Sequence, residues 1–159
     1  MANITYLTLN GQIQGLISAG CSTMDSIGNK AQLSHSDQIM ILGLNHGMSR
    51  QQNINHQSLT IVKPVDKSSP LLAKAINENE AMTCDFIFYR TNRAGLNEVY
   101  YKLKLTAARI ASIHLQLPHT VENAAGQPEE SIEFTYESIT WEHCTAGTSA
   151  YSLWSERVL

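Results

Sequence analysis

The stretch EVYYKLKL, residues 98–105, decides the fold class of this 159-residue chain. Apolar and polar side chains alternate along it in the order Glu98, Val99, Tyr100, Tyr101, Lys102, Leu103, Lys104 and Leu105. Successive side chains of an extended strand point to opposite faces, so a period of two places one set in a core and the other in solvent. The stretch therefore predicts a half-buried β-strand.

Two flanking runs extend this pattern. Residues 84–89, CDFIFY, alternate in the same way, and the polar segment 91–95, TNRAG, supplies turn-forming residues. We therefore expect the strand at 84–89 to pair with the stretch above as a hairpin. A third alternating run, residues 111–117, ends before Pro118. The intervening residues 106–109 are few enough for a tight connection or a bend.

More strands are predicted towards both ends of the chain. Residues 4–9 and 38–44 are apolar on both parities, as expected of strands covered on two sides or packed between subunits. Residues 58–62 have the composition of one more strand. Ile132, Phe134 and Tyr136 have the opposite parity to Ile139 and Trp141, which a β-bulge near Glu137 and Ser138 would reconcile. These runs together predict seven or more strands.

One segment has a helical pattern instead. Ser69 can cap a helix, and Pro70 suits its first position. Apolar residues follow at the spacing i, i+3 and i+4, namely Leu72, Ala75 and Ile76. We predict a single α-helix at about residues 70–80 within a mainly β fold, a compact antiparallel β-barrel or sandwich.

The composition argues against several classes of protein. The chain is 43% hydrophobic, which is too apolar for disorder, and its eleven Lys and Arg residues form no run that would bind nucleic acid. The N-terminus has no basic region followed by a continuous apolar region, and no stretch approaches ~18 apolar residues. We expect neither a Sec signal nor a membrane span. Three widely spaced cysteines do not indicate a disulfide scaffold.

The sequence contains no motif for catalysis or cofactor binding. The patterns G-x-S-x-G, G-x-G-x-x-G and H-E-x-x-H are absent, as are a P-loop and an EF-hand loop. The best candidates for metal ligands have no spacing that secondary structure would fix, and they are His46, His56, His143 and Cys144. Adjacent residues of a strand point to opposite faces, so His143 and Cys144 should not form a catalytic dyad. We predict no catalytic residue, no metal site and no cofactor.

Two polar features indicate surfaces rather than chemistry. Glu129 and Glu130 lie beside Pro128 in a predicted loop, where a solvated acidic pair is the ordinary case. The polar face of the strand at 98–105 carries Tyr100, Lys102 and Lys104, a stripe that could bind a partner or simply face water. The sequence leaves that second choice open.

A polar segment separates two of the predicted strands. Residues 46–57 contain glycine and several Asn and Gln residues, with Met48 and Ile54 as the apolar side chains. We expect a long loop here, and loops of this length are usually functional or disordered. Residues 123–130 form a second predicted loop.

Several separated motifs resemble the Hcp family of type VI secretion system tube proteins. The matching segments are ANITYLTL at 2–9, GQIQG at 11–15, KPVDKSSPLL at 63–72 and ITWEH at 139–143. The segments GLISAGCS at 15–22 and DSIGN at 25–29 resemble the enterobacterial subgroup. These motifs occur in order over nearly the whole chain.

This resemblance implies a structural protein. In that family, six copies of a compact β-barrel with one helix close into a ring, and the rings stack into a tube inside a contractile sheath. The implied partners are other copies of this chain, the VgrG spike, the sheath and baseplate proteins, and small effector proteins held in the lumen. Synthesis in the bacterial cytoplasm and export through the type VI apparatus without a signal peptide are implied as well.

The resemblance also implies a division of the chain and a contact surface. Residues 1–145 would form the Hcp-like β-barrel domain and residues 146–159 a C-terminal tail, without the toxin domain that some enterobacterial members carry. The segment from Asn45 to Gln57 would lie at the contact with a neighbouring subunit or ring. Its candidate interface residues are Asn45, His46, Met48, Arg50, Gln51, Gln52, Ile54 and Asn55.

Other functions remain open at this point. A monomeric β-barrel of this size could carry a small apolar ligand in its interior. A hydrolytic enzyme is a more distant alternative, since no motif supports it. The segment at 45–57 could also be a mobile loop without a partner.

Overall fold

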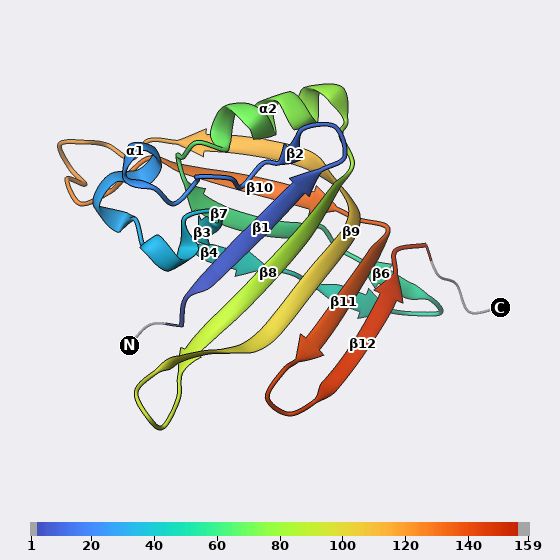
Figure 1. The fold of residues 1–159 in the computed structure, drawn as a ribbon. Coiled ribbons are helices and arrows are strands. Elements are labelled where there is room, and N and C mark those ends of the chain that lie inside the picture. The colour runs from blue at the N-terminus through green and yellow to red at the C-terminus, as the bar shows by residue number, and fades with distance from the viewer. Residues whose placement is uncertain (1–2, 156–159) are drawn as a thin grey trace.

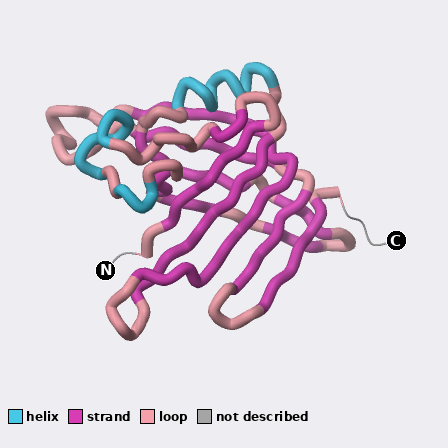
Figure 2. Tube along the Cα trace, in the orientation of Figure 1, coloured by secondary structure: helices cyan, strands magenta, loops and turns pink. Residues whose placement is uncertain are grey.

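The computed structural model describes residues 3–155 of the chain. Two layers of antiparallel strands pack face to face, with a helix across one end (Figures 1 and 2). The first layer contains β1 (Thr5–Gly11), β2 (Gly15–Leu16), β3 (Ile39–Ile41), β8 (Met82–Thr91), β11 (Ser138–His143) and β12 (Thr148–Leu153). The second layer contains β4 (Gly43–Asn45), β7 (Leu59–Pro64) and β10 (Glu129–Thr135). The predicted class, a mainly β antiparallel fold with a helix near residues 70–80, is confirmed.

Apart from one long strand, described below, and one helix, the remaining elements are short. That helix is α2 (Ser69–Glu78), and a one-turn helix α1 (Met24–Ile27) is followed by the 3₁₀ turns η1 (Gly28–Lys30) and η2 (Leu33–His35). A small separate hairpin consists of β5 (Met48–Arg50) and β6 (Ile54–His56).

Strand β9 (Asn97–Gln116) joins the two layers. Its first half pairs with β8 and β11, and its second half pairs with β10. It bends at Ala107, whose φ of 51° is uncommon for a residue other than glycine. The buried side chains change parity across this point, from Leu105 to Ala108, so both halves turn apolar residues inward. The predicted strand, its hairpin with residues 84–89 and the bend are all confirmed.

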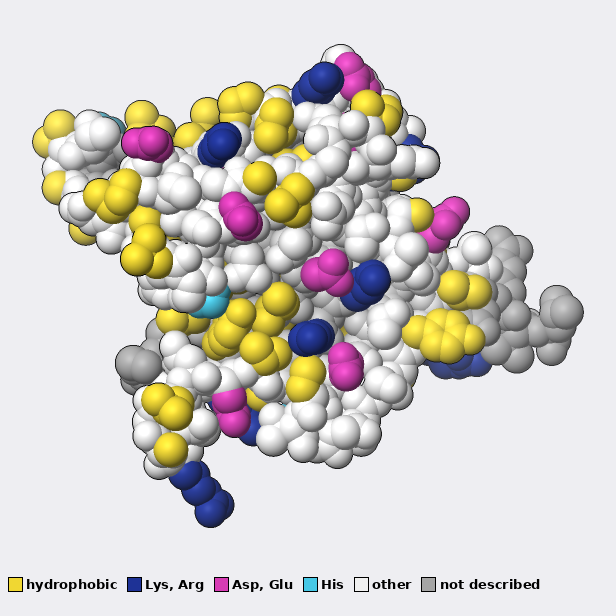
Figure 3. Space-filling view, in the orientation of Figure 1, with side chains coloured by type: hydrophobic (Ala, Val, Ile, Leu, Met, Phe, Trp, Pro, Cys, Tyr) yellow, Lys and Arg dark blue, Asp and Glu magenta, His cyan; other side chains and the backbone are white. Residues whose placement is uncertain are grey.

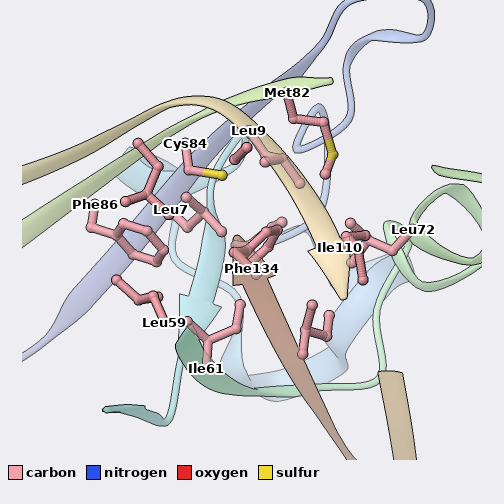
Figure 4. Packing of buried hydrophobic residues seen from close by; sticks show 14 of the residues in the cluster. Leu7, Leu9, Leu59, Ile61, Leu72, Met82, Cys84, Phe86, Ile110 and Phe134 are labelled. Carbon is pink, nitrogen blue, oxygen red and sulfur yellow. The ribbon is translucent and has the colours of Figure 1, made fainter. Parts of the chain in front are cut away.

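The core fills the space between the layers. Leu7 of β1 and Phe86 of β8 point towards Ile61 of β7 and Phe134 of β10, and all four side chains are fully buried (Figure 4). Leu72 of α2 closes one end of this cluster. Burying a side chain of this kind contributes roughly 1.5–3 kcal/mol. This packed interior is therefore the main source of stability.

Strands β10 and β11 lie end to end along β9. The buried residues change from even to odd positions at a break between these two strands. The sequence predicted a bulge within one strand at this point. The amide of Glu137 donates a hydrogen bond to the carbonyl of Thr106 at 3.1 Å. Ile139 is fully buried in β11. The interruption therefore lets apolar residues of both strands reach the core.

Helix α2 begins where it was predicted, but its predicted cap is wrong. Pro70 lies in its first turn, whereas Ser68 occupies the cap position and makes no side-chain capping hydrogen bond. The hydroxyl of Ser69 instead accepts a hydrogen bond from the amide of Asp66 at 3.1 Å and contacts Glu130. A polar network therefore occupies the start of the helix.

The centre of this network is Lys63, which is fully buried on β7. Its ammonium lies 2.9 Å from the carboxylate of Glu130 and 3.0 Å from that of Asp66. A buried charge is tolerated only when it is paired. The expected solvated pair is thus wrong for Glu130, because neighbouring residues of β10 face opposite sides and only Glu129 stays exposed. The network ties β7 and β10 to the start of α2.

A third buried carboxylate, that of Glu80, holds the turn between β1 and β2. It accepts hydrogen bonds from the amides of Ile13 and Gln14 at 3.1 and 3.0 Å, and another from the side chain of Gln14 at 3.0 Å. Burial by itself raises the pKa of Glu80, but these hydrogen bonds and the charge of Lys74 outweigh it, so the net shift is downward. The carboxylate therefore favours the folded state.

This arrangement predicts a pH dependence of folding. Because the pKa of Glu80 is lowered from 4.5, its contribution is complete above that pH and is lost as the pH falls through the folded-state value. Glu80→Gln should lower the free energy of unfolding by about 1–2 kcal/mol at neutral pH and by less in acid. Urea unfolding at several pH values checks this. An equal loss at every pH would contradict the assignment to the charged form.

Gly11 supplies the space that Glu80 occupies. A Cβ atom at this position would overlap Oε2 of Glu80. Gly11→Ala should therefore destabilise the fold by about 1–3 kcal/mol through overpacking. In a Glu80→Ala background the same change should matter much less, so a double-mutant cycle by chemical denaturation measures the contact. Additive effects of the two changes would refute this explanation.

The predicted division into a domain of residues 1–145 and a tail of 146–159 stays a prediction. Within the described residues, Thr148–Leu153 form β12, which pairs along its length with β11. Residues 156–159 lie outside the described residues. Part of the predicted tail is therefore an edge strand of the first layer.

Candidate functional site

The eight predicted interface residues occupy one β-hairpin and the strand end that leads into it. The expected loop is wrong in its secondary structure, because β5 and β6 pair in the register Met48 with His56, Ser49 with Asn55 and Arg50 with Ile54. The hairpin extends beyond the two layers, next to the end of β12 (Figure 1). The segment is thus an ordered projection rather than an irregular loop.

Most of the side chains on this hairpin are accessible. Met48 is 44% exposed, and the exposed polar residues are Asn45, Ser49, Arg50, Gln51, Gln52 and Asn55. His46 and Ile54 are half-buried. The hairpin therefore presents amides, one cation and one thioether to solvent, a mixture that suits a partly polar protein contact.

The base of the hairpin is fixed by a cluster of rings that we call the base cluster: His46, His56, Tyr136 and Trp154. The hydroxyl of Tyr136 lies 2.7 Å from Nε2 of His46 and 2.8 Å from Nδ1 of His56. The imidazole of His56 stacks on Trp154 with ring centroids 5.8 Å apart, and its Nε2 lies 2.9 Å from the hydroxyl of Ser152. The two histidines therefore have structural partners from distant segments.

Burial sets the protonation of this cluster. It lowers the pKa of His46, and repulsion from His56 lowers it further. Burial also lowers the pKa of His56, against a smaller opposing effect of a hydrogen bond to the backbone of Leu153. Burial raises the pKa of Tyr136 to about 12. Both imidazoles and the phenol are therefore neutral at neutral pH.

A groove of about 700 Å³ lies between the hairpin and the C-terminal strand. It is lined by residues 49–55 and by Trp154 and Ser155. The amide side chains and Arg50 supply hydrogen-bond donors and acceptors, while Trp154 supplies an apolar wall. Such a groove can hold a short polar segment of another chain.

His143, another of the residues weighed in the sequence, has a structural partner. Nδ1 of His143 accepts a hydrogen bond from the amide of Ala146 at 3.0 Å, and no hydrogen bond joins His143 to Cys144 in the described part of the chain. Burial, with a contribution from the charge of Asp66, raises the pKa of the Cys21 thiol to about 11. Within residues 3–155, no three His, Cys, Asp or Glu side chains are grouped to hold a metal ion.

The outer face of the first layer is a second accessible surface. It carries a shallow groove of about 360 Å³ across β8, β9 and β11, bordered by Asp85, Lys102, Lys104 and Glu142. Figure 3 shows apolar side chains beside acidic and basic ones on this face of the molecule. Charges of both signs around apolar patches are typical of the rim of a protein contact.

Sequence reasoning did not find three members of the site. Tyr136 was assigned only to a strand, and Ser152 and Trp154 to a tail of unknown role. Nothing in their spacing relates them to the hairpin, because Tyr136 is 80 positions from His56. The one available signal was the presence of Trp in a segment otherwise rich in small polar residues.

Comparisons with known proteins agree with one another. A family model described as "Type VI secretion system effector, Hcp" matches residues 6–143. The "Major exported protein" of Pseudomonas aeruginosa is 37% identical over 171 positions, which cover 99% of each chain. The "Uncharacterized protein YhhZ" of Escherichia coli K12 is 40% identical over 93% of this chain, which spans only 37% of the length of that relative.

Solved structures give the same result. "Crystal structure of Hcp protein" superposes with a TM-score of 0.91 at 32% identity and covers 98% of this chain and 99% of that one. "Secreted protein Hcp3 from Pseudomonas aeruginosa" superposes with a TM-score of 0.88 at 36% identity and covers 98% of this chain and 100% of that one.

None of the helices in the described residues is long and apolar enough to cross a membrane.

Proposed function

The chain belongs to the Hcp family of structural proteins of the type VI secretion system, and from this premise we propose that six copies close into a ring. Rings stack into the secreted inner tube, and the lumen carries small effector proteins. The observation that carries this proposal is the hairpin of β5 and β6, which projects from the molecule with its polar and apolar side chains accessible.

A ring or a stack needs two different complementary surfaces on each copy. The hairpin offers one of them. Away from it, the chain exposes large apolar side chains on the β1–β2 turn, on η2 and on the loop after β9, among them Ile13, Leu33 and Val121. Leu33 is 98% exposed, so its whole side chain is accessible to another copy. Separate surfaces of this kind support head-to-tail contacts between copies.

The partners and the absence of catalysis are part of the same proposal. We infer contacts with the spike, the sheath and the baseplate proteins at the outer surface and ends of the tube. Export takes place through the type VI apparatus. The chain acts by assembly and transport, not as an enzyme, and needs no cofactor.

The alternative of a monomeric ligand carrier has less support. The interior between the layers is occupied by side chains such as Leu7, Phe86 and Phe134, which are fully buried. A carrier of an apolar molecule needs an interior space of about 300–1,000 Å³. The grooves described above lie instead at the hairpin and on the outer face of the sheet.

Export and tube formation test the proposal together. The chain should accumulate in the culture medium of a bacterium with an active type VI apparatus and should remain inside a strain that lacks the contractile sheath. Negative-stain images of the purified protein should show rings or tubes with six-fold symmetry. Equal release from both strains, with only monomers in the images, would contradict the proposal.

A further inference from the structure

One hydroxyl links two imidazoles at the base of the hairpin. Tyr136 lies between His46 on the β4–β5 connection and His56 on β6, within hydrogen-bond distance of both. His56 is also held by Ser152 and by the face of Trp154 at the end of β12. Three segments far apart in the sequence therefore meet at this point and set the direction of the hairpin.

Only some protonation states of this network give every hydrogen-bonding group a partner. A phenol has one hydrogen, so its oxygen can donate to one imidazole while it accepts from the N–H of the other. All these groups are satisfied when at least one of the two imidazoles is neutral. If both carry a second proton, each ring nitrogen facing Tyr136 becomes a donor, and the phenol hydrogen loses its acceptor. An unpaired buried hydrogen-bonding group costs about 1–3 kcal/mol.

Among the described residues, the surroundings offer no compensation for two positive charges. The described groups that face the pair are the phenol of Tyr136, the hydroxyl of Ser152, the indole of Trp154 and the carbonyl of Leu153. The nearest charged neighbours in sequence, Arg50 on β5 and Glu137 beside Tyr136, are both exposed. Water screens such charges, so they contribute little stabilisation to the two imidazolium groups.

We propose that His46, Tyr136 and His56 form a pH-sensitive latch that fixes the hairpin in its assembly orientation and opens when both imidazoles are protonated. The opening itself depends only on the geometry of the base cluster. Its consequence for tubes rests on the proposed function, because it requires the hairpin to be a contact between copies. A tube that reaches an acidic compartment would then come apart and release what it carries.

The direction of the pH effect follows from the protonation of the cluster. Burial and mutual repulsion hold the pKa of His46 below 6.5, and burial holds that of His56 below it. The closed latch favours neutral imidazoles, so its contribution is complete above pH 6.5 and is lost as the pH falls through the two lowered values. Opening takes up two protons, so its equilibrium constant depends steeply on pH. Each proton changes that constant by up to about tenfold per pH unit.

Hydrogen–deuterium exchange of residues 45–57 tests the latch directly. The purified full chain is compared at about pH 7.5 and about pH 5, with rates corrected for the intrinsic pH dependence and at a concentration where no tubes form. The hairpin amides of the wild type should exchange at least about tenfold faster in acid. The core strand β8 should stay equally protected at both values. Unchanged protection of the hairpin would overturn the proposal.

Three variants separate the latch from general acid sensitivity. The double variant His46→Gln/His56→Gln cannot take up the protons, so its hairpin should show no acid-induced step. His114→Gln, a change at an exposed histidine of β9, should behave like the wild type. Tyr136→Phe removes the shared hydroxyl and should leave the hairpin fast-exchanging at both pH values. A wild-type acid step in the double variant, or unchanged protection in Tyr136→Phe, would refute the latch.

Tube images at the two pH values separate this inference from the proposed function. Tubes of the wild type should shorten in acid, and those of the double histidine variant should not. If the hairpin opens in acid by exchange and tubes still keep their length, the latch stands. In that case the proposed role of the hairpin in assembly is wrong.

Discussion

Lys63→Met should lower the free energy of unfolding by about 3–5 kcal/mol, because it leaves two buried carboxylates without their cation. Lys63 is fully buried and lies 2.9 and 3.0 Å from Glu130 and Asp66. Methionine keeps most of the volume of the side chain, so the loss reports the charge rather than a cavity. Chemical denaturation at one fixed protein concentration measures it, since assembly would otherwise shift the apparent stability.

Neighbouring glutamates provide the matched control. Glu129→Gln removes an exposed charge and should change the stability by less than about 0.5 kcal/mol. Glu130→Gln, one residue further, removes a charged partner of Lys63 and should lower the free energy of unfolding clearly more. If Lys63→Met behaves like Glu129→Gln, the network does not hold β7, β10 and α2 together.

Replacing Gly47 to Asn55 by a short Gly/Ser linker should abolish long tubes and spare the fold. The hairpin contributes no residue to the hydrophobic core, and a change of loop length alters closure entropy only slowly. The replacement keeps His46 and His56, so the base cluster retains its hydrogen-bonding residues. Tube length by electron microscopy is the measurement, with the circular dichroism melt as the folding control. A folded variant with tubes as long as the wild type would remove the hairpin from the interface.

A single charge reversal tests the same surface without removing the hairpin. Arg50→Glu should shorten tubes more at low salt than at high salt, because the interaction of exposed charges is screened. Arg93→Glu is the matched control, since Arg93 is also exposed but lies in the turn between β8 and β9. It should leave the salt dependence of tube length as in the wild type.

The sequence predicted the parts of the fold that depend on local patterns. The alternation in residues 98–105 located β9, the turn residues at 91–95 joined it to β8, and Pro70 marked the start of α2. Periodicity reports which face of an element is buried, and it needs no knowledge of the partner. The resemblance to Hcp proteins, based on separated motifs, gave the family that the comparisons confirm.

What the sequence could not show depends on long-range partners. The strands of the hairpin have three residues each and a polar composition, so neither length nor pattern distinguishes them from a loop. Glu130 looked solvated because its cation, Lys63, lies 67 positions away. The base cluster combines residues from 46 to 154. Such contacts form because distant segments become neighbours in the fold, and local sequence patterns do not indicate which segments these are.

The mass of the purified particle in solution tests the central claim most directly. Six copies of a 17.6 kDa chain should elute together, and light scattering or native mass spectrometry should give a particle of six chains or a multiple of six at micromolar concentration. The closed symmetry of a ring forbids intermediate sizes as stable products. A particle of one chain over the same concentration range would contradict the ring, and with it the tube and the proposed role of the hairpin.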